Sequence, residues 1–169
     1  TVIRPADANE VAEAWRLAID NRTSPTVLAL TRQAVPTFEK PAGPTVEKGA
    51  YILKDFGAEP QLILMASGSE VGLIHAAAQK LYEEGTPVRV VSFPSWELFE
   101  KQDEAYRESV LPKRITARLA VEAGVAQGWE KYAANVISLE HFGASAPAKV
   151  VFEEFGFTVE NVLEKARQL

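Results

Sequence analysis

Cysteine is absent from the 169 residues of this chain, and its apolar runs are all short. Without cysteine the protein can form no disulfide, use no thiolate in catalysis and hold no zinc through sulfur ligands. No apolar run approaches the ~20 residues that cross a bilayer, so we expect no membrane partner. The segment Thr1 to Pro5 lacks the apolar core and cleavage site of a secretory signal, and it does not begin with methionine. We therefore expect a fragment of a longer protein.

Positive charge is also scarce. Lys and Arg total 18 against 23 Asp and Glu, which gives a formal net charge of −5. This balance argues against sequence-independent nucleic-acid binding, which depends on clustered basic side chains. Residues 1–40 hold five basic and five acidic residues, whereas residues 41–169 hold 13 and 18. A neutral N-terminal region followed by an acidic remainder indicates that the two regions have different neighbours.

The chain starts with an amphipathic pattern. Apolar residues recur at the i, i+3, i+4, i+7 positions from Val11 to Ala18, and this spacing predicts a helix over 7–21. Asp7 and Glu10 have the spacing of a capping box at the start of that helix. The first regular element is therefore a helix that begins at an aspartate.

A short apolar run over 26–31 predicts a buried strand. The periodicity then stops. Between residues 33 and 48 the composition is that of a linker, with one glycine and three prolines: Pro36, Pro41, Gly43 and Pro44.

After residue 48, short apolar runs alternate with helical patterns. Strands are predicted over 49–55, 61–66, 88–93, 116–121 and 135–139. Helices are predicted over 71–81, 95–99, 103–110 and 125–132, with a last helix that begins at Thr158. Strands separated by helices predict an α/β fold, a three-layer α/β/α arrangement with a mostly parallel sheet.

Two charged residues stand at the ends of the first predicted elements. Asp7 at a helix N-cap bonds backbone N–H groups, which is worth ~1 kcal/mol, but its carboxylate can also accept a hydrogen bond from a substrate hydroxyl. Arg32 follows an apolar strand, and ligands gather at the carboxyl ends of strands in open α/β sheets. The planar guanidinium of Arg32 suits the binding of a phosphate through two N–H donors. The alternative interpretation is that Arg32 is a surface residue at the start of a loop. The residues alone favour the structural interpretation at both positions.

Other polar residues give weaker signals. The turn over 67–70 precedes a helix, where backbone N–H groups can bind an anion, but Glu70 would repel a phosphate and capping by Ser69 is the simpler interpretation. His75 is expected at the rim of a helix, and His141 in a loop. Tryptophans occur in cores and at interfaces, and the residues alone leave both interpretations open for Trp15, Trp96 and Trp129.

An ordered series of motifs resembles the end of the transketolase family. Arg4-Pro5-Ala6-Asp7 and Thr31-Arg32-Gln33 are similar to two segments that close the family's pyrimidine-binding domain. The similarity continues through 68–71, 101–112, 121–124, 142–148 and 152–158. It implies three parts. Residues 1–34 would end the pyrimidine-binding domain as a helix-strand remnant of a second α/β domain, 35–48 would be a linker, and 49–169 would form the family's C-terminal α/β domain.

Transketolases move a two-carbon ketol unit between sugar phosphates with thiamine diphosphate and a divalent metal, Mg²⁺ or Ca²⁺. The resemblance implies that Asp7 contacts a sugar hydroxyl and that Arg32 binds the acceptor's phosphate. It also implies three kinds of partner, namely sugar phosphates, the rest of a transketolase chain, and a second subunit in a homodimer. The homodimer that the resemblance implies makes an interface role for one of the three tryptophans a hypothesis. The expected location is cytoplasmic.

The family's metal-diphosphate motif is missing, because no Gly-Asp-Gly followed by a distant Asn is present. Neither His75 nor His141 matches the family's active-site histidines. We therefore expect no catalytic, cofactor-binding or metal-binding residue in this chain, and no activity from the chain alone. Two alternatives stay open: a free-standing nucleotide- or anion-binding α/β module, and the tail of another thiamine-dependent enzyme such as dihydroxyacetone synthase.

Overall fold

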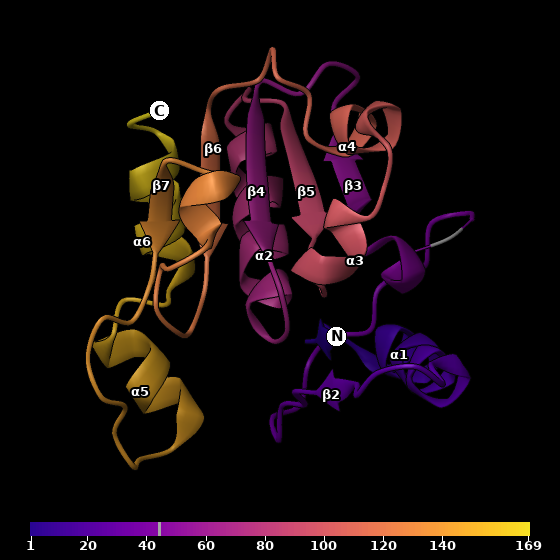
Figure 1. The fold of residues 1–169 in the computed structure, drawn as a ribbon. Coiled ribbons are helices and arrows are strands. Elements are labelled where there is room, and N and C mark those ends of the chain that lie inside the picture. The colour runs from indigo at the N-terminus through magenta and orange to yellow at the C-terminus, as the bar shows by residue number, and fades with distance from the viewer. Residues whose placement is uncertain (44) are drawn as a thin grey trace.

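A computed structural model describes residues 1–43 and 45–169 as a five-stranded sheet with a smaller N-terminal unit beside one end of it (Figure 1). The large sheet has the order β3-β5-β4-β6-β7, and only the edge strand β3 runs antiparallel to its neighbour. Its strands are β3 (Tyr51–Phe56), β4 (Leu62–Ala66), β5 (Val88–Ser92), β6 (Arg118–Val121) and β7 (Asn135–Ile137). The expected α/β fold with a mostly parallel sheet is confirmed.

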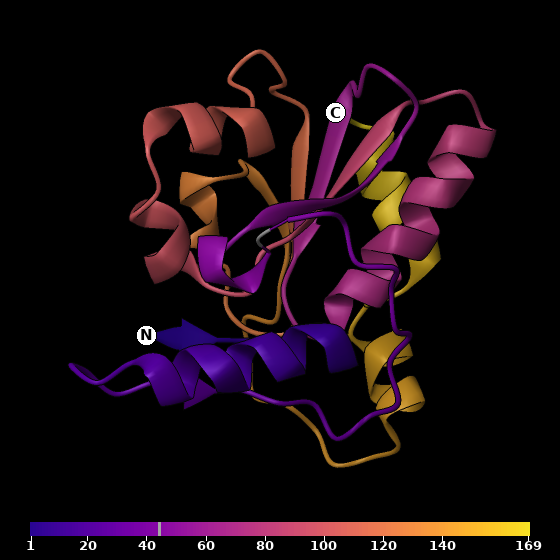
Figure 2. The same cartoon turned by 90° about the vertical axis from the view of Figure 1, so that its right-hand side faces the viewer.

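Helices cover both faces of this sheet (Figure 2). On one face lie α2 (Glu70–Glu83) and α6 (Val159–Ala166), and on the other lie α3 (Trp96–Glu100) and α4 (Glu104–Val110). Every residue of β4 and β5 is buried, as expected for strands with helices on both sides. Along β4 the side chains alternate between the two cores: Leu62, Leu64 and Ala66 face α2, whereas Ile63 and Met65 join the core that contains Phe93 and Trp129.

The N-terminal unit consists of β1 (Val2–Ile3), α1 (Ala8–Asp20) and β2 (Val27–Leu28), with β1 and β2 paired in parallel. The predicted helix is confirmed, but the prediction of a buried strand over 26–31 is wrong in extent and burial. Val27 is 56% exposed and Leu30 47% exposed. Among the described residues β2 pairs only with the two-residue strand β1, so its other edge has no strand partner there.

The predicted linker packs against both parts of the molecule. Val46, in the 3₁₀ turn Val46–Lys48, is buried with Ile3 and Ala14, and Phe38 packs against the core beside α2. Pro44, one of the prolines that indicated the linker, lies outside the described residues. The division of the chain at residues 34 and 48 stays a prediction.

Two local predictions are corrected near the C-terminal end. The helix expected over 125–132 is only a 3₁₀ turn, Trp129–Lys131. Gly128 precedes it with a φ of 95°, and a Cβ there would lie 2.5 Å from the Trp96 ring, so tight packing replaces a regular helix. A helix that no pattern predicted, α5 (Ala148–Glu154), starts after Pro147 and buries none of its residues. No helix in the described part of the chain has the length and apolar character to cross a membrane.

Candidate functional site at the junction of the two units

Asp7 lies at the junction between the N-terminal unit and the large sheet, and it is only 5% exposed. Its Oδ1 accepts a hydrogen bond from the Glu10 N–H at 2.9 Å, and its Oδ2 accepts one from the Phe38 N–H at 2.8 Å. The predicted N-cap is therefore confirmed. Each oxygen keeps further acceptor capacity, because an ionised carboxylate has about four acceptor sites.

Arg32 lies in an exposed bend after β2. Val2 pairs with Val27 in parallel, so the carboxyl ends of β1 and β2 lie at the same edge, and the segments that contain Asp7 and Arg32 both leave from it. In the described part of the chain the two side chains form no hydrogen bond or ion pair with each other, since the partners of Asp7 are backbone N–H groups. The predicted substrate contacts stay predictions.

Glu10 is a buried carboxylate that joins the two units. It is 2% exposed, and its Oε1 accepts hydrogen bonds from the Tyr51 hydroxyl at 2.7 Å and the Ser92 hydroxyl at 2.5 Å. Its Oε2 accepts the Ala6 N–H at 2.7 Å. Burial raises the pKa of Glu10, while the three hydrogen bonds act in the opposite direction. The sequence indicated Glu10 only as a capping residue.

Arg4 forms a second connection, to the carboxyl ends of β4 and β6. Its Nη2 lies 3.1 Å from Oε2 of Glu70, its Nη1 bonds Oε1 of Glu122, and the Trp129 ring N–H donates to the other Glu122 oxygen at 3.1 Å. The backbone of Arg4 is also held, because its N–H donates to Pro94 O and its carbonyl accepts the Gly68 N–H. Burial raises the pKa of Glu70, and Arg4 counteracts this increase.

The turn over 67–70 does not form the cap that was predicted. Ser69 adopts helical backbone angles and makes no side-chain cap, because its hydroxyl donates to Glu70 Oε1 at 2.6 Å. Glu70 is fully buried at this point, and Arg4 already binds it. A negative charge thus occupies the position where a phosphate loop would need a positive potential.

A cavity of about 410 Å³ opens beside this charge cluster, at the carboxyl ends of the central strands. Its apolar side is formed by Phe93, Trp96 and Trp129, and its polar side by Arg4, Glu97 and Glu122. Both carboxylates are engaged: Glu97 accepts the Val2 N–H and the Ser95 hydroxyl, and Glu122 accepts Arg4 and Trp129. With its one arginine bound to two carboxylates, the cavity offers little to an anion.

The histidines lie where the sequence placed them. His75 is half-buried on α2 between the rings of Phe38 and Phe56, with centroid distances of 4.9 and 5.3 Å. Its pKa is lowered, first by burial and then by the nearby Lys54. His141 is exposed in a loop, with its ring 4.8 Å from that of Phe155. The rim and loop interpretations are confirmed.

The tryptophans differ in their surroundings. Trp129 is a core residue with 1% exposure, and Trp96 packs edge-on against it at 5.4 Å. Trp15, on α1, is 53% exposed and is the remaining candidate for an interface.

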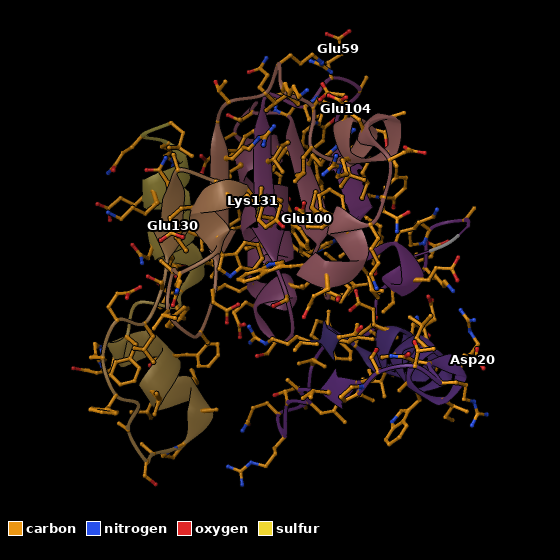
Figure 3. All side chains as sticks on the ribbon, in the orientation of Figure 1. Asp20, Glu59, Glu100, Glu104, Glu130 and Lys131 are labelled. Atoms are coloured by element: carbon orange, nitrogen blue, oxygen red, sulfur yellow. The ribbon has the colours of Figure 1, made fainter. Side chains whose placement is uncertain are left out.

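Other charged groups lie away from this junction. Figure 3 labels Glu100 and Lys131, which face each other from α3 and the 3₁₀ turn at 129–131. Their closest atoms are 2.7 Å apart, and Glu100 also accepts the Tyr132 hydroxyl at 2.6 Å. These bonds connect elements of one face of the sheet, which is a structural role.

The side chains in the described part of the chain do not match the ligand set of a metal-diphosphate site. Across residues 1–43 and 45–169, no three His, Cys, Asp or Glu side chains gather closely enough to hold a metal ion. Asp7 and Glu10 are neighbours, but their oxygens point at N–H and O–H donors within the fold. We therefore derive no chemical step through thiamine diphosphate or a metal from these residues.

Comparisons with known proteins agree with this fold. Residues 49–158 match the family model described as the transketolase-like TK C-terminal domain. The transketolase of Nostoc sp. is 51% identical over 174 aligned residues, which cover 100% of this chain and 26% of that protein. The chain thus spans about a quarter of the length of the curated relatives it matches.

Solved structures give the same result. The transketolase from Leishmania mexicana superposes with a TM-score of 0.92 at 43% identity, covering 99% of this chain and 25% of that one. The Pichia stipitis transketolase in complex with sedoheptulose-7-phosphate superposes with a TM-score of 0.88 at 40% identity, covering 99% and 24%. A match along nearly the whole chain does not favour a free-standing nucleotide-binding module. The chain belongs to the transketolase family, of which it forms a C-terminal part.

Proposed function

We propose that this chain is the C-terminal part of an active transketolase, which transfers a two-carbon ketol unit between sugar phosphates. The main support is the parallel pairing of β1 and β2, which directs the Asp7 and Arg32 segments to one edge of a chain whose relatives are transketolases. The relative from Pichia stipitis forms a complex with sedoheptulose-7-phosphate, a ligand that offers both hydroxyls and a phosphate.

In this proposal Asp7 accepts a hydrogen bond from a sugar hydroxyl and Arg32 binds a phosphate. Backbone N–H groups use one acceptor site on each Asp7 oxygen, which leaves capacity for a hydroxyl. Arg32 is exposed, and a guanidinium can bind phosphate oxygens through two parallel N–H donors. Both residues act by holding the substrate in place, a contribution to catalysis that needs no proton transfer from this chain.

Thiamine diphosphate and Mg²⁺ or Ca²⁺ would supply the ketol-transfer chemistry from a site on the rest of the protein. Exposed apolar side chains on the N-terminal unit support a further part of the proposal, in which that unit contacts the remaining transketolase chain and a second subunit of a cytoplasmic homodimer. Trp15 at 53%, Ile19 at 60% and Val27 at 56% exposure lie on this unit.

The test is a ketol-transfer assay with thiamine diphosphate and Mg²⁺ on the full-length protein and on the 169-residue chain. We expect turnover only from the full-length protein. In that protein Arg32→Gln should raise KM for a phosphorylated acceptor by about 10- to 100-fold, the value of a hydrogen bond to a charged group. KM for an acceptor that lacks the phosphate should not change.

Arg22→Gln is the matched control, because Arg22 is also an exposed arginine of the N-terminal unit, in the connection between α1 and β2. It should leave both KM values unchanged. Turnover by the 169-residue chain alone would contradict the proposed division of labour. An Arg32→Gln effect of equal size on both acceptors would contradict phosphate binding.

A further inference from the structure

The large sheet reaches the Asp7 segment through two hydroxyl groups. Tyr51 on β3 and Ser92 on β5 are direct partners in the antiparallel register, so their side chains lie on the same face of the sheet. Both hydroxyls donate to one oxygen of Glu10, at 2.7 and 2.5 Å. Glu10 belongs to α1 in the N-terminal unit, and the contact spans 41 residues to Tyr51 and 82 to Ser92.

Glu10, which Tyr51 and Ser92 hold in place, is in turn bonded to Asp7 and to the residue before it. The Glu10 N–H donates to Asp7 Oδ1 at 2.9 Å, and the other Glu10 oxygen accepts the N–H of Ala6, the residue before Asp7. The Asp7 carboxylate is thus aimed by the same residue that Tyr51 and Ser92 hold. In the described part of the chain the Asp7 side chain forms no hydrogen bond with the large sheet, since its two bonds go to the N–H groups of Glu10 and Phe38.

We propose that Tyr51 and Ser92 are positioning residues for substrate binding. By holding Glu10 they fix the direction of the Asp7 carboxylate, and so the C-terminal α/β unit controls substrate affinity without touching the substrate. This inference rests on the proposed function, because it requires that Asp7 contacts a sugar hydroxyl. Contacts of this kind are sensitive to position: a displacement of about 1 Å can cost about 100-fold in rate.

The surroundings of Glu10 support the proposal. The carboxylate is 2% exposed, so it cannot turn to water when a donor is removed, and it must shift toward its remaining partners. Those partners are the Ala6 N–H and the other hydroxyl. On the opposite side of Asp7 the chain is held by Arg4, whose guanidinium binds Glu70 and Glu122. Asp7 lies between Arg4 and Glu10 in the sequence. A shift of Glu10 while Arg4 stays fixed should therefore displace Asp7.

The test uses the full-length transketolase that contains this chain, with a ketose phosphate as donor. Tyr51→Phe removes one hydroxyl that bonds Glu10. We expect KM for the ketose to rise at least about fivefold, within the range that misplacement of a contact can produce, with a smaller change in kcat. Tyr106→Phe is the matched control, because the Tyr106 hydroxyl bonds the carbonyl of Ala50, next to Tyr51, and not Glu10. It should leave KM unchanged.

A double-mutant cycle separates positioning from general weakening of the fold. Asp7→Asn keeps a good N-cap residue but removes the anionic acceptor. In the Asp7→Asn background, Tyr51→Phe should change KM by less than about twofold, because its effect passes through the lost carboxylate. Ser92→Ala should behave like Tyr51→Phe in both backgrounds, and it decides the question if Tyr51→Phe does not fold.

The failures can be told apart. An inactive wild-type enzyme would overturn the proposed function and this inference with it. If wild-type is active but Asp7→Asn leaves KM unchanged, Asp7 binds no substrate and the positioning role is wrong. If Asp7→Asn raises KM but Tyr51→Phe and Ser92→Ala match Tyr106→Phe, transketolase activity and the Asp7 contact stand while the inference is overturned. Equal effects of Tyr51→Phe in both backgrounds would also overturn it.

Discussion

Replacing Arg4 with methionine should destabilise the protein by about 3 kcal/mol. The substitution leaves two carboxylates without their cation, and the Glu70 and Glu122 side chains are only 1% and 10% exposed. Removing one partner of a buried ion pair costs about 3–5 kcal/mol, and we take the lower end because Arg4 itself is 30% exposed. At about 2–4 °C per kcal/mol for a chain of this size, the midpoint of thermal unfolding should fall by about 6–12 °C.

The loss should depend on pH. Burial raises the pKa of Glu70 above its usual value of 4.5, the charge of Glu122 raises it too, and Arg4 lowers it. Without Arg4 this pKa rises further. A carboxyl with a raised folded-state pKa destabilises the fold while it is ionised, and this penalty disappears as pH falls through that pKa. The Arg4→Met variant should therefore lose more stability at pH 8 than at pH 5.

Urea unfolding at both pH values measures the effect, with Arg16→Met as the matched control. Arg16 pairs with Glu47 at 3.1 Å and Asp20 at 3.7 Å, but its side chain is 55% exposed, so its loss should cost less than about 1 kcal/mol. Adding Glu70→Gln to Arg4→Met should restore part of the stability at pH 8. The reasoning is refuted if Arg4→Met and Arg16→Met agree within about 0.5 kcal/mol at both pH values.

Three further predictions concern separate features. Burial raises the pKa of Glu10 above 4.5, so wild-type should lose stability relative to Glu10→Gln as pH rises from about 4.5 to 8 in urea unfolding; a constant difference would contradict this. Gly128→Ala should lower the stability measured by thermal unfolding more than Gly85→Ala does. Both glycines have positive φ, but only Gly128 faces the Trp96 ring. Gly85→Ala should cost about 1 kcal/mol, and equal losses for the two variants would be inconsistent with the packing. Trp15→Ala should change the stability of this chain by less than about 0.5 kcal/mol but weaken dimers of the full-length protein in sedimentation, where an unchanged mass would rule out the interface role.

Short-range chemistry explains what the sequence predicted well. Asp7 caps α1 because an aspartate and the N–H three residues later meet in any helix start, whatever surrounds them. The run over 61–66 forms β4 because it is apolar on both sides, and helices cover both faces of the sheet. Both features could be predicted because the residues of each element carry the signal themselves.

The predictions fail where residues far apart in the sequence determine the local structure or its burial. The apolar run over 26–31 has the pattern of a buried strand, but among the described residues β2 pairs only with β1, and Val27 and Leu30 are exposed. The helix expected over 125–132 yields to the contact between Gly128 and Trp96. No pattern brings together Tyr51 and Ser92, since their meeting at Glu10 follows from the register of β3 on β5. The candidate site was thus predictable as two motifs but not as a hydrogen-bonded assembly.

The bond between Arg4 and Glu122 spans 118 residues of sequence, so it has a consequence for the order of folding. A ribosome that adds about 5–20 residues per second makes Glu122 about 6–24 s after Arg4. Throughout that interval Arg4 lacks Glu122, which follows β6, and among the described residues its other carboxylate partner is Glu70. The bond between Arg4 and Glu122 therefore cannot form until the residues up to Glu122 have been synthesised, although Arg4 lies near the start of this sequence.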